Sequence, residues 1–238
     1  MKKTLQILTI SLALVASGQA ATISIVNGDF ETGGLADNSN SAFPGVIPTG
    51  WVAMPGAAPS GGFFGYFNPV NDAGGYVSGV SGTPGVTGTM AGPNVFYFGS
   101  SSSGQGIQQT LAATFTANTD YTLTVARGTR NSNFNNTLRM SLLVGSTVLT
   151  TRDVAPEPSG SRGTFLDYFT TYTYSAADAG LVGQALIVRF QEIDNPGNPQ
   201  FEVDIDNVRL SAVPEPGSAS LLILGLAAVL ARTRRCRR

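Results

Sequence analysis

Short apolar runs that repeat at every second position dominate residues 21–212. The segment 121–126 (YTLTVA) places Tyr, Leu and Val on one side of an extended chain and Thr, Thr and Ala on the other. The segment 185–191 alternates in the same way, with Leu186, Val188 and Phe190 opposite Arg189 and Gln191. A period of two residues buries one face of a strand and leaves the other in water, as in antiparallel sheets. The pattern therefore predicts an all-β domain.

The spacing of these runs favours an antiparallel β-sandwich of the jelly-roll type. Gly, Asn, Thr, Ser and Pro separate runs that are rich in β-branched and aromatic residues. About ten strands in one domain are typical of a jelly roll, and only residues 175–183 are expected to hold a helical turn or two. The strands are expected at residues 22–26, 51–54, 95–98, 106–115, 121–127, 138–144, 147–152, 165–174, 185–191 and 201–210.

The last expected strand changes phase along its length. Its apolar residues occupy odd positions from 201 to 205 and even positions from 208 to 210. One extra residue near Asp206-Asn207 explains the change and predicts a β-bulge. Like charges on one face repel each other unless they are solvated or bridged by a cation. Three acids share the face opposite the apolar one: Glu202, Asp204 and Asp206.

The charge and the missing residue types exclude several functions. Residues 21–212 contain seven arginines, no lysine and 14 acidic residues, a formal charge of −7. Proteins that bind nucleic-acid phosphates carry the opposite charge, so that class is excluded. The chain has no histidine, and its one cysteine, Cys236, lies outside this domain. The usual Ser/His and Cys/His catalytic pairs are therefore absent, and no disulfide can stabilise the domain.

Residues 1–20 have the features of a secretory signal peptide. Lys2 and Lys3 precede an apolar run at 5–15, and Gly18 and Ala20 supply small side chains at the −3 and −1 positions of a cleavage site. The alternative is an N-terminal membrane anchor, but the run is shorter than the ~20 residues that a bilayer span needs.

Residues 213–238 form a second segment outside the domain. Pro214, Glu215 and Pro216 precede an apolar stretch at 218–231, which is expected to be a short transmembrane helix, and an arginine-rich end at 232–238. At ~1.5 Å per residue such a helix reaches only ~21 Å, which is short of a ~30 Å hydrocarbon core. The positive-inside rule keeps the arginines cytoplasmic and leaves the domain on the other side of the membrane.

This C-terminal arrangement resembles the PEP-CTERM sorting signal. The resemblance implies that an exosortase-type enzyme recognises the tail while the tail is a transient anchor in the inner membrane. It also implies export in a Gram-negative bacterium and delivery to the cell surface or an extracellular exopolysaccharide matrix. The alternative is a permanent single-span anchor, in which the tail is retained rather than cleaved.

Motifs along the domain resemble galactose-binding-like jelly rolls, which include many carbohydrate-binding modules. The matching stretches are 27–31 (NGDFE), 50–51 (GW), 108–111 (QQTL), 121–123 (YTL) and 205–208 (IDNV). In that family a structural calcium often lies beside the first and last strands, and the matching positions are Glu31 and Asp206. Carboxylate oxygens suit this ion. Asn207 departs from the pattern, because the family commonly has a second aspartate there.

The stretch from Gly56 to Gly92 is rich in Gly, Ala, Pro and Ser and is too long for an ordinary connection. Trp51, at the start of an expected strand, is expected to pack in the core rather than stack on a sugar. Four aromatic residues of the long stretch either form a sugar-binding platform or pack onto their own domain: Phe63, Phe64, Tyr66 and Phe67.

The sequence therefore predicts an exported, non-catalytic protein of the cell surface or matrix, whose domain binds polysaccharide. Two alternatives stay open, a glycan-processing hydrolase and a structural coat component without sugar affinity. Two carboxylates can hydrolyse glycosides without histidine. The candidate acids for such a hydrolase are Glu31, Asp72, Glu192, Asp194 and Glu202.

Overall fold

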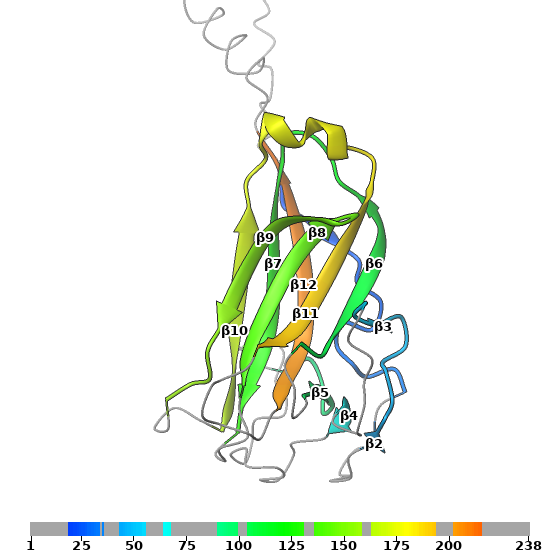
Figure 1. Ribbon diagram of the computed structural model, residues 1–238, viewed down its shortest axis with the longest axis vertical. Helices are drawn as coiled ribbons and strands as arrows, with labels where there is room; N and C mark the ends of the chain where they lie inside the picture. The colour runs from blue at the N-terminus through cyan, green and yellow to red at the C-terminus, as the bar shows by residue number, and fades with distance from the viewer. Residues whose placement is uncertain are drawn as a thin grey trace, which may run out of the picture.

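Two antiparallel sheets face each other as a β-sandwich, which confirms the predicted all-β class (Figure 1). The computed structural model describes residues 19–33, 35, 43–55, 64–67, 90–99, 104–130, 136–158, 163–193 and 202–215. Residues 1–18 of the expected signal peptide and the expected helix at 218–231 lie outside these ranges. Among the described residues, no helix has the length and apolar character needed to cross a membrane.

The first sheet has the strand order β10-β7-β12-β5-β4-β2, and β1 also pairs with β12. Its strands are β1 (Ala21–Ile23), β2 (Phe43–Pro44), β4 (Phe64–Phe67), β5 (Val95–Phe98), β7 (Thr119–Thr129), β10 (Thr164–Tyr172) and β12 (Val203–Pro214). The second sheet has the order β3-β6-β11-β8-β9. Its strands are β3 (Val52–Ala53), β6 (Gly106–Thr114), β8 (Thr137–Val144), β9 (Thr147–Val154) and β11 (Ala185–Ile193).

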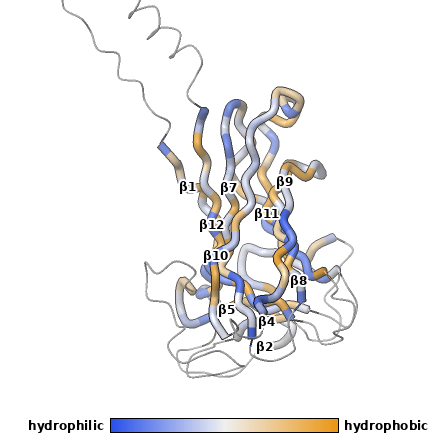
Figure 2. Tube along the Cα trace, turned by 90° about the vertical axis from the view of Figure 1, so that its left-hand side faces the viewer, coloured by the Kyte–Doolittle hydropathy of each residue, from blue (hydrophilic) through white to orange (hydrophobic). Residues whose placement is uncertain are grey.

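The alternating apolar residues fill the space between the two sheets. Leu123 and Val125 of β7 belong to the same buried cluster as Val188 and Phe190 of β11. Figure 2 shows hydrophobic segments along the strands of both sheets. Trp51 packs in this core, as expected, and its Nε1 donates to a backbone carbonyl oxygen at 3.2 Å.

The predicted bulge in the last strand is confirmed. β12 pairs with β7 over residues 204–206 and again over 209–214, with a register shift between the two parts. Asn207 has a φ of 49°, a left-handed conformation that Asn tolerates better than most residues. The extra residue lets the apolar side chains on both sides of the bulge reach one core: Val203, Ile205, Val208 and Leu210.

The expected helical turn is the 3-10 helix η3 (Ala176–Leu181). Its N-cap residue, Ser175, accepts a hydrogen bond from the amide of Ala177. Two short strands were not expected, β2 and β4, which pair with each other and extend the first sheet beyond β5. Gly and Pro surround both strands in the sequence, and that composition predicts loops.

Candidate active site

Acidic side chains line the outer face of the first sheet at the start of β12. The core-facing residues here are apolar, so Glu202, Asp204 and Asp206 lie on the opposite face, as predicted. The strand register places Asp204 between Tyr97 of β5 and Gly128 of β7. The same face carries an apolar cluster that is separate from the main core: Met90, Val95, Tyr97, Ala126 and Phe165.

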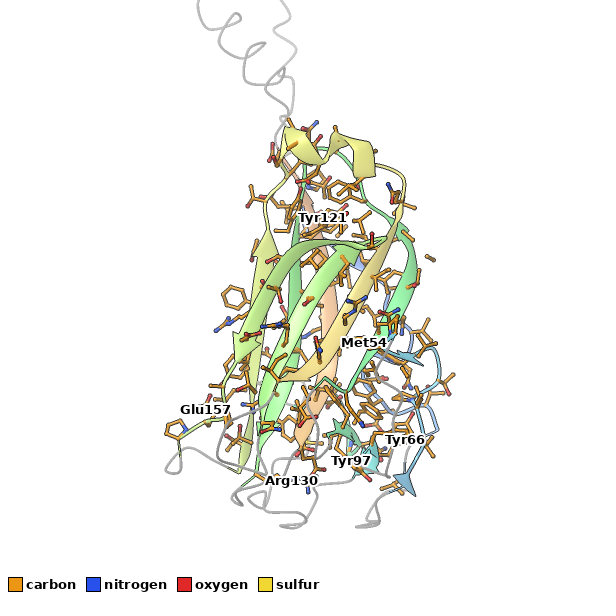
Figure 3. All side chains as sticks on the ribbon, viewed as in Figure 1. Met54, Tyr66, Tyr97, Tyr121, Arg130 and Glu157 are labelled. Carbon is orange, nitrogen blue, oxygen red and sulfur yellow. The ribbon has the colours of Figure 1, made fainter. Side chains whose placement is uncertain are left out.

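Arg130, the residue that follows β7, bridges two of the acids. Its Nε donates to Asp204 Oδ2 at 2.8 Å. Its Nη2 donates to Glu202 Oε1 at 2.6 Å and to Asp204 Oδ1 at 3.1 Å. The Glu202 side chain is 16% exposed and that of Asp204 only 2%. Tyr97, Arg130, Glu202 and Asp204 are called the acid cluster below, and Tyr97 and Arg130 lie at the same end of the sandwich in Figure 3.

The acid cluster contains a carboxyl group that holds its proton at neutral pH. Burial raises the pKa of Glu202 to about 8, with a further contribution from the charge of Asp204, and Arg130 opposes the shift. The contact with Arg130 is compatible with this proton, because Oε1 can accept as a carbonyl oxygen while Oε2 carries the hydrogen. Burial also raises the pKa of the Tyr97 hydroxyl. A neutral carboxylic acid beside a neutral phenol is suited to general acid catalysis.

Buried polar residues behind the acid cluster hold the backbone of Glu202. The amide N–H of Asn136 donates to the Glu202 carbonyl oxygen at 3.1 Å. The side chain of Asn136 donates to the carboxylate of Glu192, which is fully buried. Arg127 donates to the carbonyl oxygens of Asn136 at 2.5 Å and Ala155 at 2.7 Å. Segments from both sheets are therefore tied together directly beneath the acids.

Glu31 and Asp206, the two predicted calcium ligands, both bind the segment 90–94. The Glu31 carboxylate accepts from the backbone N of Asn94 at 2.8 Å and from its Nδ2 at 2.6 Å. Asp206 accepts from the amide of Ala91 at 2.7 Å. Burial raises the pKa of Asp206; its bonds to backbone amides oppose that shift, and the charges of Glu31 and Asp29 add to it.

This second group of acids fits a hard cation in part. Among the residues that the structure describes, no cluster of three or more His, Cys, Asp or Glu side chains is arranged as a metal site. A calcium ion here would need main-chain or water oxygens besides Glu31 and Asp206. Gly92 packs closely on the carboxylate, since a Cβ at this position would come within 2.2 Å of Glu31 Oε1.

Of the four aromatic residues proposed as a sugar platform, the two with described side chains are not exposed. Phe64 and Tyr66 are buried in the main core, where the rings of Tyr66 and Phe96 lie 6.2 Å apart. Of the three sorting residues, Pro214 ends β12 and Glu215 follows it. The other predicted positions lie outside the described residues: Phe63, the side chain of Phe67, Asp72, Asp194 and Pro216.

Sequence patterns pointed to Glu202 and Asp204 but not to their partners. Tyr97 looks like an ordinary strand residue, and Arg130 lies in a polar stretch with no fixed spacing to the acids. One signal was available, because three acids on one strand face favour a bridging cation. A domain without lysine can supply that cation from its own side chains only as arginine.

Comparison with known proteins identifies both parts of the chain. Residues 21–211 match the HpiC1-like family, described as HpiC1 cyclase, and residues 212–238 match the PEP-CTERM protein-sorting motif. The Stig cyclase FisC from Fischerella sp. TAU, solved in complex with (3Z)-3-(1-methyl-2-pyrrolidinylidene)-3H-indole, is 25% identical, with 83% of this chain and 100% of that chain covered and a TM-score of 0.63. The apo form of a cyclase from Fischerella sp. is also 25% identical, with 82% and 98% covered and a TM-score of 0.64.

Carbohydrate-binding modules are also among the similar structures. A family 16 module is 13% identical, with 52% of this chain and 79% of that chain covered and a TM-score of 0.35. No curated protein sequence matches the chain.

These findings correct one prediction and confirm another. The expectation of a non-catalytic protein is wrong, because nearly the whole domain matches a cyclase family. That expectation relied on the missing histidine and on a sequence in which no spacing singled out a pair of acids, but carboxyl and phenol groups also perform acid–base chemistry. The sorting motif confirms an exported protein that is membrane-anchored, processed by an exosortase-type system and sorted to the surface. The chain belongs to the HpiC1 cyclase family and joins that domain to a PEP-CTERM sorting motif.

Proposed function

We propose that the protein is a cyclase-type enzyme of the cell surface and that Glu202 is its general acid. The observation that carries this proposal is the acid cluster, in which a protonated and largely buried carboxyl group is held by Arg130 beside Tyr97. Carboxyl groups with strongly shifted pKa values and a defined charged partner concentrate at active sites. The family match of the domain supports the same assignment.

Acid-initiated cyclisation requires no group beyond these side chains. Glu202 gives its proton to an electron-rich carbon of the substrate, and a double bond or ring of the same molecule attacks the resulting cation. A new carbon–carbon bond forms, and the loss of a substrate proton to the carboxylate restores the acid. Substrate and product therefore have the same composition. Arg130 and Asp204 fix the position of Glu202, and Tyr97 lies beside Asp204, where a bound substrate would contact it.

An aromatic substrate suits the surroundings of the acid cluster. Met90, Tyr97 and Phe165 form a buried apolar cluster beside the acids, and Ala126 and Gly128 add no bulky side chain. Flat rings pack well against such groups. Because FisC was solved with an indole compound, we propose an indole, or a similar electron-rich aromatic compound that carries an alkene, as the substrate class.

Binding of (3Z)-3-(1-methyl-2-pyrrolidinylidene)-3H-indole, measured by calorimetry, tests the location of the site. The wild type should bind this probe, and Tyr97→Ala should weaken binding at least tenfold. Asp153→Asn is the matched control, because it removes an exposed ion pair with Arg139 on the second sheet. Failure of the wild type to bind, or equal losses in Tyr97→Ala and Asp153→Asn, would refute the location.

Turnover of an alkenyl indole, followed by NMR and mass spectrometry, tests the chemistry. The wild type should convert it to a cyclic product of unchanged mass. Glu202→Gln keeps the shape of the side chain but has no acidic proton, so the rate should fall about 100-fold or more. A Gln variant as fast as the wild type would show that Glu202 is not the acid.

A second candidate function is polysaccharide binding on the same face. The carboxyl and guanidinium groups on this face can form the hydrogen bonds that sugar ligands require. It accords with a place in the exopolysaccharide matrix of a Gram-negative bacterium. Affinity electrophoresis in polysaccharide gels tests it, and retardation that Tyr97→Ala does not reduce would reject this face as the binding surface.

A structural calcium ion is also proposed between Glu31 and Asp206. The two carboxylates share the segment 90–94, and the charges of Glu31 and Asp29 act on the buried Asp206. A divalent cation would remove this repulsion and join the N-terminal segment to the last strand.

A further inference from the structure

The sorting motif begins inside the folded domain. The match starts at residue 212, whereas β12 continues to Pro214. Val213 pairs with Asp120, and Pro214 pairs with Thr119 at the start of β7. The amide of Glu215 then donates to the carbonyl oxygen of Asn118 at 2.7 Å. The first two residues of Pro-Glu-Pro are therefore held by the sheet.

The side chains of the paired residues are exposed, but one edge of their backbone is covered by β7. Val213, Pro214 and Glu215 are exposed. Neighbouring strands lie only ~4.8 Å apart, so β7 occupies one backbone edge of this segment completely. An enzyme that cuts or transfers a peptide must enclose an extended stretch of chain, and a stretch paired in a sheet cannot enter such a cleft.

The chain between Glu215 and the apolar stretch is too short to separate the domain from the membrane. Only Pro216 and Gly217 separate Glu215 from the apolar stretch that begins at residue 218. Two residues span at most ~7 Å, so an anchored tail brings this end of the domain to the membrane surface. The sorting enzyme therefore meets the motif where it still lies against β7.

We propose that the domain holds its own sorting motif and that residues 213–215 must leave residues 118–120 before an exosortase-type enzyme can bind them. The partner surface is then the opened end of β12, not a free linker. Incompletely folded chains expose the motif, and folded chains are processed at the rate at which this strand end opens. This inference does not depend on the chemistry proposed for the acid cluster.

A disulfide across the pair tests the proposal in the native host. Asp120→Cys with Val213→Cys joins residues that are directly opposite, and such pairs have Cα distances of about 4.5–5.5 Å, within the range of disulfides. Cys236→Ser is included in every variant, so that the engineered thiols find only each other. The matched control is Thr122→Cys with Thr171→Cys, which joins β7 to β10 and leaves β12 free.

The readout is the fraction of chains that have lost Arg238, from intact mass. The oxidised 120–213 variant should be trimmed at least tenfold more slowly than the control disulfide, and a reductant should restore trimming. Insertion of Gly-Ser-Gly-Ser between Ala212 and Val213 should accelerate it. Equal trimming of the two disulfide variants would overturn the proposal. Retention of Arg238 in the unmodified chain would overturn both the proposal and its premise of processing.

Discussion

Glu202 retains its proton because of its surroundings, and this has a consequence for stability. Its pKa is about 8 in the folded protein against an ordinary value of 4.5. A carboxyl group whose pKa is raised by folding contributes stability to the folded state while it is protonated. This contribution is complete below the pKa of the unfolded state and is lost as the pH rises through the pKa of the folded state. The stability that the protonated Glu202 contributes should therefore be lost between about pH 4.5 and about pH 8.

Comparison of the wild type with Glu202→Gln should reveal this titration. The Gln variant imitates the neutral acid, so its stability should not fall with the ionisation of residue 202. Between pH 5 and 9 the wild type should lose on the order of 4 kcal/mol relative to the variant. Chemical denaturation at each pH measures the difference. The stability of Asp153→Asn should change with pH between 5 and 9 as that of the wild type does. Arg139 lowers the pKa of Asp153, so the ionisation of Asp153 affects stability only at acidic pH.

At the scale of residues, sequence patterns predict which face of a strand a side chain occupies but not its long-range contacts. Alternation along β12 identified the face that Glu202 and Asp204 share, because alternation is local. The contact with Arg130 joins residues more than 70 positions apart, since the separation from Asp204 is 74. Only the register between β7 and β12 determines that contact, and register depends on the packing of the whole sandwich. The acids could therefore be predicted, and the cluster could not.

At the scale of elements, strong alternation was sufficient and composition was misleading. β5, at residues 95–98, lies where it was predicted, and the bulge in β12 follows from its change of phase. β4 was missed because its four residues lie within a Gly-rich stretch whose composition predicts loop. Pairing with β5 and β2 supplies the backbone hydrogen bonds of β4, and the local sequence does not predict this pairing. Tertiary pairing outweighs local propensity for such short strands.

The proposed calcium ion belongs to the same scale, because it would join three segments. Glu31 lies near the N-terminus, residues 91–94 precede β5, and Asp206 lies at the bulge of β12. Removal of the ion should restore the repulsion around the buried Asp206. A chelator should therefore lower the melting temperature of the wild type by several degrees, and calcium should restore it.

Glu31→Gln and Asp153→Asn distinguish this site from a general effect of the chelator. The first should melt lower and respond little to the chelator, whereas the second should respond like the wild type. Magnesium should restore the wild type poorly, because it prefers a smaller and more regular coordination sphere. An unchanged melting temperature of the wild type in chelator would refute the proposed calcium site.

At the scale of the whole molecule, the acid cluster and the sorting motif lie at opposite ends of one strand. β12 begins beside Glu202 and ends at Pro214, and it runs the length of the sandwich (Figure 1). At about 3.3 Å per residue its 12 residues span about 35–40 Å. The end near Pro214 also carries η3, because residues 115–118 bind both Gly183 and Glu215. An anchored domain should therefore place η3 at the membrane and the acid cluster far from it.

Single fluorescent labels can measure this orientation, since a domain without cysteine needs only Cys236→Ser as background. Val182→Cys places a label beside η3, where the side chain is 44% exposed. Glu157→Cys places one at the other end, where the Glu157 amide donates to Thr129, a neighbour of Arg130. With the full chain in vesicles, spin-labelled lipid headgroups should quench the label at 182 strongly and the label at 157 little. A substrate would then reach the acid cluster from the extracellular medium. Equal quenching at both positions would mean that the domain lies flat on the membrane, and stronger quenching at 157 would place the acid cluster against the lipid.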